Sequence, residues 1–302
     1  MKRNNQHNRA SESGQTLVIV AVLLLGLVAI TALVIDGGNI YLQRRRMQNA
    51  ADAGALAGVR ALALDQGYSA AYAAATDYCS QRNGADRCAV SVSGVSFIVR
   101  ACEDAQMTFA RVLNLDQVEV CAQAAARFGP VSRAWGAAPI AMREFDFDFV
   151  TTYSMWDDAK DEDPVTSHNI SGSFRGWLTL DCVYPTNCSP AGASTLSDWM
   201  RNGYQGFTDI NIWIRGDSGT KASTIAEARV GQVLLLPVFN QITDMYSNKS
   251  YYHILTFAAF EVSSVKKTGT PKGITGKFLK YVMPGPPTGS EDDGVRSIAL
   301  TQ

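Results

Sequence analysis

The feature that most constrains this 302-residue chain is an uncharged apolar run near its start. From Gln15 to Ile35 there are 21 residues and no charge. A bilayer core about 30 Å thick needs roughly 20 helical residues, whereas the apolar part of a cleaved secretory signal is usually about 7–15 residues long. The run has no polar face and no convincing Ala-x-Ala site follows it. We therefore expect a retained transmembrane helix over residues 15–35, anchored by residues such as Gln15, Leu17, Leu24, Leu33 and Ile35.

The charges that flank the run leave its orientation open, because basic residues occur on both sides of it. The cysteines favour one orientation. All six follow the run, their number is even, and none has the CxxC spacing of a zinc site. This pattern favours disulfides formed in an oxidising compartment over free thiols. We therefore expect a single-pass protein of the cytoplasmic membrane with its N-terminus inside and most of the chain outside the cytoplasm. The disulfide candidates are Cys79, Cys88, Cys102, Cys121, Cys182 and Cys188, and of 15 possible connectivities the pairing of sequence neighbours is favoured.

The segment after the run predicts that the helix continues beyond the membrane. Apolar residues recur at helical spacing in "NIYLQRRRMQNAADAGALAGVRALALDQG", and its alanine content favours a helix. The three arginines follow the apolar run at a distance from which their long stems can reach lipid headgroups. Gly54 and Gly58 are four residues apart and permit close approach of another helix, although small residues are common in any alanine-rich helix.

Residues 12–58 also carry an ordered set of motifs: Gly14-Gln15, the apolar run, Asp36-x-Gly38, Tyr41, an arginine cluster ending at Arg46, and Gln48-Asn49-Ala50-Ala51-Asp52-Ala53. This combination resembles the N-terminal segment of TadE/TadG-like proteins of the Tad (Flp) pilus system. The resemblance implies a membrane-anchored, pseudopilin-like or minor-pilin-like assembly protein with its N-terminus inside. Gly14-Gln15 also resembles a pilin leader junction. However, Ile19 stands where that junction has glutamate, so processing of the leader is left open.

The rest of the chain predicts an α+β protein. A second helix is expected over residues 66–82, strands within 88–102, a short helix within 105–115 and a strand over 116–128. Glycine and proline near residue 130 indicate a change of domain. Beyond it, strands are expected at 145–153, 177–180, 231–239, 253–262 and 277–282, with helical pieces at 196–202 and 223–229. We therefore predict a cytoplasmic N-terminus (1–14), a transmembrane helix (15–35), a pilin-like helix with a small αβ layer (36–129), and a β-rich, sandwich- or barrel-like extracytoplasmic domain (130–302).

Motifs for chemistry are weak throughout. The acidic residues of "EFDFDFV" and of the run at 157–163 lack the glycine and terminal glutamate of a calcium-binding loop, and no hydrolase or P-loop motif occurs. The net charge of −1 gives no reason to expect a nucleic-acid partner. The sequence thus predicts no catalytic residue, no cofactor and no metal site.

No local motif supports a membrane-tethered hydrolase. Two other function classes are left. The first is a structural component of a Tad-type pilus whose partners are the lipid bilayer, pilins or other pilus-assembly proteins, and cell-surface or wall components, with a role in adhesion. The alternative is a membrane-tethered binding module whose C-terminal domain captures a carbohydrate or peptide. Trp156, Trp177, Trp199 and Trp213 are its candidate groove residues, although such side chains are more often part of a core.

Overall fold

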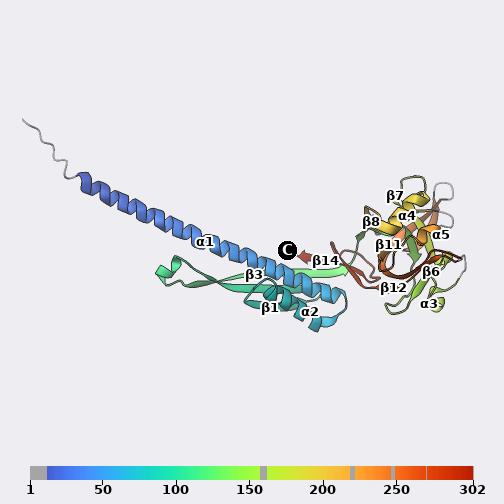
Figure 1. The fold of residues 1–302 in the computed structure, drawn as a ribbon, viewed down its shortest axis with the longest axis horizontal. Helices are drawn as coiled ribbons and strands as arrows, with labels where there is room; N and C mark the ends of the chain where they lie inside the picture. Colours follow the sequence, from blue (N-terminus) through green and yellow to red (C-terminus); the bar gives the residue numbers. More distant parts are fainter. Residues whose placement is uncertain (1–11, 157–161, 218–221, 246–248, 270, 302) are drawn as a thin grey trace, which may run out of the picture.

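A computed structural model describes residues 12–301 except 157–161, 218–221, 246–248 and 270. Its dominant element is α1 (Glu12–Ala63), a rod of 52 residues whose first half projects away from the rest of the molecule (Figure 1). In that half the apolar side chains are exposed: Leu17 is 71% and Leu33 is 75% exposed. Among the described residues, α1 is the one helix that is long and apolar enough to cross a membrane.

The second half of α1 lies on a five-stranded sheet. The strand order is β1 (Arg87–Ser93), β2 (Ser96–Gln106), β3 (Gln117–Pro130), β14 (Val295–Thr301) and β13 (Tyr281–Pro284). All neighbours are antiparallel except β13 and β14, which are parallel. A short helix, α2 (Gly67–Thr76), extends into a π-helical turn, η1 (Asp77–Gln81), and packs beside α1. The core between helix and sheet is built from small residues of α1 and side chains of β2 such as Phe97 and Val99.

Two strands of this sheet come from the end of the chain. The sequence predicts a change of domain at residue 130. The five-stranded sheet, however, combines β1, β2 and β3 from before this position with β13 and β14 from after it. The returning strand β14 pairs with β3 from Arg296↔Pro130 to Thr301↔Ala125. Arg296 also donates to Asp65 at 2.7 Å and to the carbonyl of Ala63 at 2.9 Å, and Lys280 pairs with the same Asp65 carboxylate. These bonds fasten the end of α1 to the returning chain.

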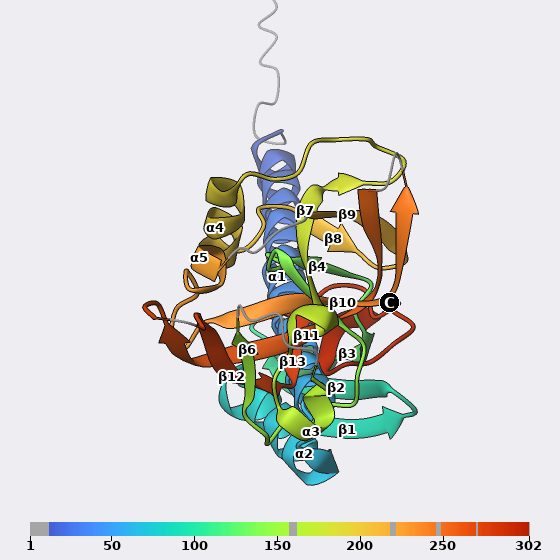
Figure 2. The ribbon, with the colours of Figure 1, turned by 90° about the vertical axis from the view of Figure 1, so that its right-hand side faces the viewer.

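Residues 131–279 form a second unit around a closed five-stranded barrel. Its strands, in order around the ring, are β10 (Val233–Met245), β5 (Ile140–Arg143), β7 (Arg175–Val183), β9 (Ile212–Asp217) and β11 (Lys249–Lys266), which pairs back with β10. Closure leaves this ring without a free edge. The long strand β11 also carries β12 (Gly273–Leu279) and β6 (Tyr153–Trp156) at its far end. The remaining elements are β4 (Arg133–Trp135) paired with β8 (Phe207–Asp209), α3 (Pro164–Ser167), η3 (Gly172–Phe174), α4 (Ala193–Asn202) and α5 (Ala222–Ile225). Figure 2 looks onto this unit along the molecule, with α1 behind it.

The predicted fold class, α+β with a long N-terminal apolar helix and a strand-rich, barrel-like C-terminal part, is confirmed. Three local expectations are wrong. Residues 145–152 form no strand, because the Asp148 carboxylate accepts the backbone N–H groups of Val150 and Thr151 and turns the chain. The helix expected over 105–115 is only a 3₁₀ turn, η2 (Ala110–Leu113), since Ala105 and Gln106 belong to the β2–β3 ladder. The strand expected at 277–282 is divided, because β12 pairs in the barrel and β13 in the other sheet.

Candidate functional site

The junction between the apolar run and the sheet is organised by one carboxylate. Asp36 directly follows the run and is only 7% exposed. Its oxygens accept three successive backbone N–H groups at the tip of the β2–β3 hairpin, from Thr108 at 2.8 Å, Phe109 at 3.0 Å and Ala110 at 2.7 Å. Burial alone would raise the pKa of Asp36, but these donors outweigh burial and lower the pKa below its ordinary value of 3.8. An ionised Asp36 therefore caps η2 from another element, as an N-cap residue does within its own helix.

Two further contacts hold the same hairpin tip on α1. The Asn39 side-chain amide donates to the carbonyl of Gln106 at 2.8 Å. Met107 is 3% exposed and forms a small apolar cluster with Ala105 and Val120, against which Ile40 of α1 packs. Because polar and apolar contacts lie within one turn of helix, the tip is held at a fixed height along α1.

The residues of the TadE/TadG-like motif fall on two faces of α1 beyond the apolar run. Ala50 and Ala51 are fully buried against the sheet, and Gln48 donates to Asp52 at 2.8 Å and to the carbonyl of Gln123 at 3.5 Å. The opposite face is open. Tyr41 is 67% exposed, Arg46 and Asn49 are exposed, and a Cβ added to Gly38 would meet nothing within 4 Å.

The predicted helix-packing glycines contact this chain's own domain. A Cβ at Gly54 would lie 3.0 Å from the carbonyl oxygen of Ala75 and 3.2 Å from Cβ of Cys79. A Cβ at Gly58 would lie 2.6 Å from Cδ1 and 2.7 Å from Cζ of Phe97, which is closer than packed carbon atoms approach. These glycines therefore allow α1 to approach α2 and β2. A contact with a helix of another protein at the same positions stays a prediction.

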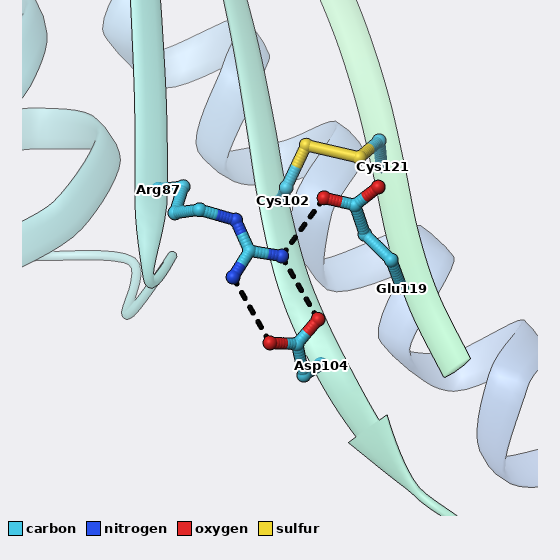
Figure 3. The surroundings of a disulfide bond; sticks show 5 residues. All are labelled: Arg87, Cys102, Asp104, Glu119 and Cys121. Carbon is cyan, nitrogen blue, oxygen red and sulfur yellow. Dashed lines mark hydrogen bonds and ion pairs between the residues drawn. A yellow bond between two sulfur atoms is a disulfide. The ribbon is translucent and has the colours of Figure 1, made fainter. Parts of the chain in front are cut away.

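The six cysteines form three disulfides between sequence neighbours, Cys79–Cys88, Cys102–Cys121 and Cys182–Cys188. Cys102 and Cys121 face each other across β2 and β3, and Arg87 joins Asp104 and Glu119 beside them, each at 2.8 Å (Figure 3). Although Glu119 lies close to both sulfurs, the disulfide and the arginine occupy the groups that a metal would need. This cluster is therefore a cross-strand brace on the sheet.

The barrel unit carries an exposed aromatic pair that the sequence did not single out. Trp135 on β4 and Phe207 on β8 are 48% and 55% exposed, with ring centroids 5.1 Å apart, and the Arg133 guanidinium lies over the Phe207 ring at 5.0 Å. Trp135 falls in the segment near residue 130 in which the sequence predicts a change of domain. The four tryptophans expected to form a groove are less accessible: Trp177 and Trp199 are each 8% exposed, and Trp156 and Trp213 are half-buried. Of the acidic run at 157–163, residues 157–161 lie outside the described residues.

Comparison with known proteins gives one informative match. No curated protein and no solved structure matches the chain. Residues 14–61 match the model of the family described as "Putative Flp pilus-assembly TadE/G-like". The match begins just before the apolar run, includes Asp36 and both faces of the helix beyond it, and ends near the end of α1. The resemblance inferred from the motifs is thereby confirmed over this segment, about a sixth of the chain, which is similar to this pilus-assembly family.

Proposed function

We propose that the protein is a structural, minor-pilin-like component of a Tad-type pilus assembly, anchored in the cytoplasmic membrane by residues 15–35, with its N-terminus inside and both β units outside the cytoplasm. The three disulfides support this side of the membrane, because such bonds form and persist in oxidising compartments. The family match supports the pilus assignment, and that family is described by an assembly role rather than a reaction.

The observation that carries the proposal is the pair of faces on α1. One face is used up by the chain's own sheet, through Ala50, Ala51 and the two glycines. The other face keeps motif residues that this fold leaves exposed, among them Gly38, Tyr41 and Asn49. Gly38 and Tyr41 are three residues apart and Tyr41 and Asn49 are eight apart, close to one and two helical turns, so they line one side of the part of α1 that follows the apolar run. A small residue beside an aromatic one suits the close packing of a second helix. The partner that fits this face is the membrane-proximal helix of a pilin or assembly protein.

The test is site-specific photo-crosslinking in cells that make the pilus. A photoreactive phenylalanine analogue at Tyr41 should form adducts with pilus proteins. The same analogue at Tyr68 of α2, which is 60% exposed just beyond the far end of α1, is the matched control. Tyr41→Ala should reduce piliation, whereas Tyr68→Ala should not. Equal adducts from both positions, or normal piliation with Tyr41→Ala, would count against the proposal.

The exposed Trp135–Phe207 pair favours a second candidate function, capture of a carbohydrate or peptide by the barrel unit. Exposed aromatic faces beside a guanidinium offer stacking and a hydrogen-bond donor to such a ligand. Glycan- and peptide-array binding by the full chain should be lost with Trp135→Ala and kept with Tyr41→Ala. Binding that is the same with Trp135→Ala would remove this candidate.

A further inference from the structure

The height of the β2–β3 hairpin tip relative to the bilayer can be worked out from α1. Residues 15–35 as a helix span about 31 Å, at 1.5 Å per residue, which matches a hydrocarbon core of about 30 Å. The tip is bonded to Asp36, one residue beyond this span. Figure 1 shows the hairpin running back beside α1. Its tip therefore lies at the level at which a helix spanning the bilayer with residues 15–35 leaves the membrane.

The contacts of the tip extend below that level. Phe109 lines a hollow of about 360 Å³ together with Leu24, Leu27, Val28 and Thr31, all within the apolar run. Thr31 lies about 6 Å along the axis from Ile35, on the membrane side. The Phe109 ring is thus at the depth of acyl chains whenever residues 15–35 span the bilayer.

The side chains at the tip match this position. Val112 is 86% exposed, Leu115 is 53% and Phe109 is 38% exposed. Large apolar side chains grouped at an exposed turn need a covering partner. Arg111 in the same turn is exposed and carries a positive charge to the level of the headgroups. The backbone of the turn is suited to an apolar surrounding as well, since three of its N–H groups are bonded to Asp36.

We propose that this tip, residues 107–116, is a second membrane contact: Phe109, Val112 and Leu115 insert among the acyl chains of the leaflet from which α1 emerges, and Arg111 contacts lipid phosphates. The occupant is the lipid bilayer, because the tip continues the lipid-facing surface of α1. This inference rests on the proposed membrane anchoring. Attachment at two points stops α1 from turning about its axis, so the open face with Tyr41 keeps one direction in the plane of the membrane.

The test measures the depth of single nitroxide labels on the full chain in phospholipid nanodiscs. All six native cysteines are in disulfides, so an introduced cysteine is the single free thiol. The test position is Val112→Cys. The control for water exposure is Val95→Cys, at the β1–β2 turn on the opposite end of the sheet and 54% exposed. The control for membrane depth is Leu25→Cys, in the middle of the apolar run.

The expected result is that the Val112 label collides several-fold more with dissolved oxygen, relative to a water-soluble nickel chelate, than the Val95 label does. Similar oxygen-to-nickel collision ratios for the Val112 and Val95 labels, with the Leu25 label in lipid, would overturn the tip insertion and leave the anchoring intact. Frequent collisions of the nickel chelate with the Leu25 label would overturn both the anchoring and the tip insertion. A Val112 label shielded from both probes would mean that protein, such as a second copy, covers the tip, and would also overturn the proposal. Because Val112 is almost fully exposed, its substitution should leave the three native disulfides in place, and peptide mapping without reduction checks this.

Discussion

Replacing Gly58 by alanine should loosen the helix–sheet unit even though alanine is the better helix former. Gly58 lies five residues before the end of α1, and the atoms nearest to a new Cβ belong to the Phe97 ring on β2. Phe97 is fully buried, and its ring packs edge-on against Tyr72 of α2 with centroids 5.6 Å apart. The ring therefore has no free direction in which to move away from the new methyl group.

Two opposing terms set the magnitude. Replacing glycine by alanine in a helix gains about 1 kcal/mol. Overpacking a well-filled core costs about 1–3 kcal/mol, and an overlap at 2.6–2.7 Å with a held aromatic ring belongs at the upper end. The net loss is then about 2 kcal/mol, or about a 30-fold rise in the equilibrium constant for opening.

Hydrogen exchange of the β2 amides, measured by mass spectrometry on the full chain, is the assay. All five tryptophans belong to residues 131–302, so their fluorescence follows the barrel unit separately and should be unchanged. In a Phe97→Leu background the overlap is relieved, and Gly58→Ala should then be neutral or stabilising. If Gly58→Ala slows exchange in the natural background, or costs the same in both backgrounds, the reasoning about the close approach is refuted. A piliation defect from a bulky residue at Gly58 would equally reflect this internal damage, so it would be no evidence for a contact with another protein.

Three further outcomes follow from local chemistry. Replacing Cys102 and Cys121 by serine opens a loop of about 20 residues and should lower the free energy of unfolding of the sheet by about 3 kcal/mol. The urea concentration at which half of the β2 and β3 amides lose protection from exchange should therefore fall, and an unchanged midpoint would contradict this. The pKa of Asp36 is lowered in the native state, so its bonds to the hairpin tip should stabilise the fold at pH values above about 4 and weaken as the pH falls through the native pKa. A nitroxide at Val112→Cys should therefore become more mobile on acidification, and Asp36→Asn should remove that pH dependence. Burial, with Glu144, Asp292 and Glu291 nearby, raises the pKa of Asp293 to about 6, so its ionisation destabilises the fold as the pH rises from about 4 through 6. Asp293→Asn should therefore stabilise the fold by about 1–2 kcal/mol at pH 7.5, after allowing for partial exposure, and have no such effect at pH 4; thermal unfolding at the two pH values checks this.

Local patterns were enough to predict the elements whose causes are local. The length of the apolar run predicts the exposed half of α1, and the alanine spacing predicts its continuation beyond the membrane. A proline in a strand, such as Pro237, indicates an edge or a bulge, and the register of β10 against β11 shifts directly after it, between Val238 and Phe239. The Asn83-Gly84 turn brings Cys79 close to Cys88, so their pairing follows from a short loop.

Elements whose causes are distant were not predictable in this way. The strand β14 is an ordinary short apolar–polar stretch, and nothing in its residues indicates that its partner β3 lies more than 160 residues earlier. The motif marked Asp36 as important through resemblance alone. Its three N–H partners lie 72–74 residues away in a turn whose sequence predicted a longer helix. The exposure of the tip at Val112 and of Trp135 also depends on which surfaces the tertiary fold leaves uncovered.

The position of Asp36 beside an apolar span has a physical reason that joins these elements. A carboxylate at the membrane edge is costly unless it is bonded, and the first N–H groups of η2 are equally in need of acceptors. The Asp36 carboxylate and these N–H groups satisfy one another. They can do so only while Asp36 stays on the same side of α1 as the buried Met47 and Ala50, because Asp36 binds the hairpin tip of the sheet on which Met47 and Ala50 pack. One residue deleted between positions 36 and 47 would turn Asp36 by about 100° relative to those residues, because a helix has 3.6 residues per turn. The helix could then dock on the sheet or cap the hairpin tip, but not both. The length of helix between the bilayer and the sheet is thus fixed by the fold itself, and this fixed length sets the depth of the tip and the direction of the open face together.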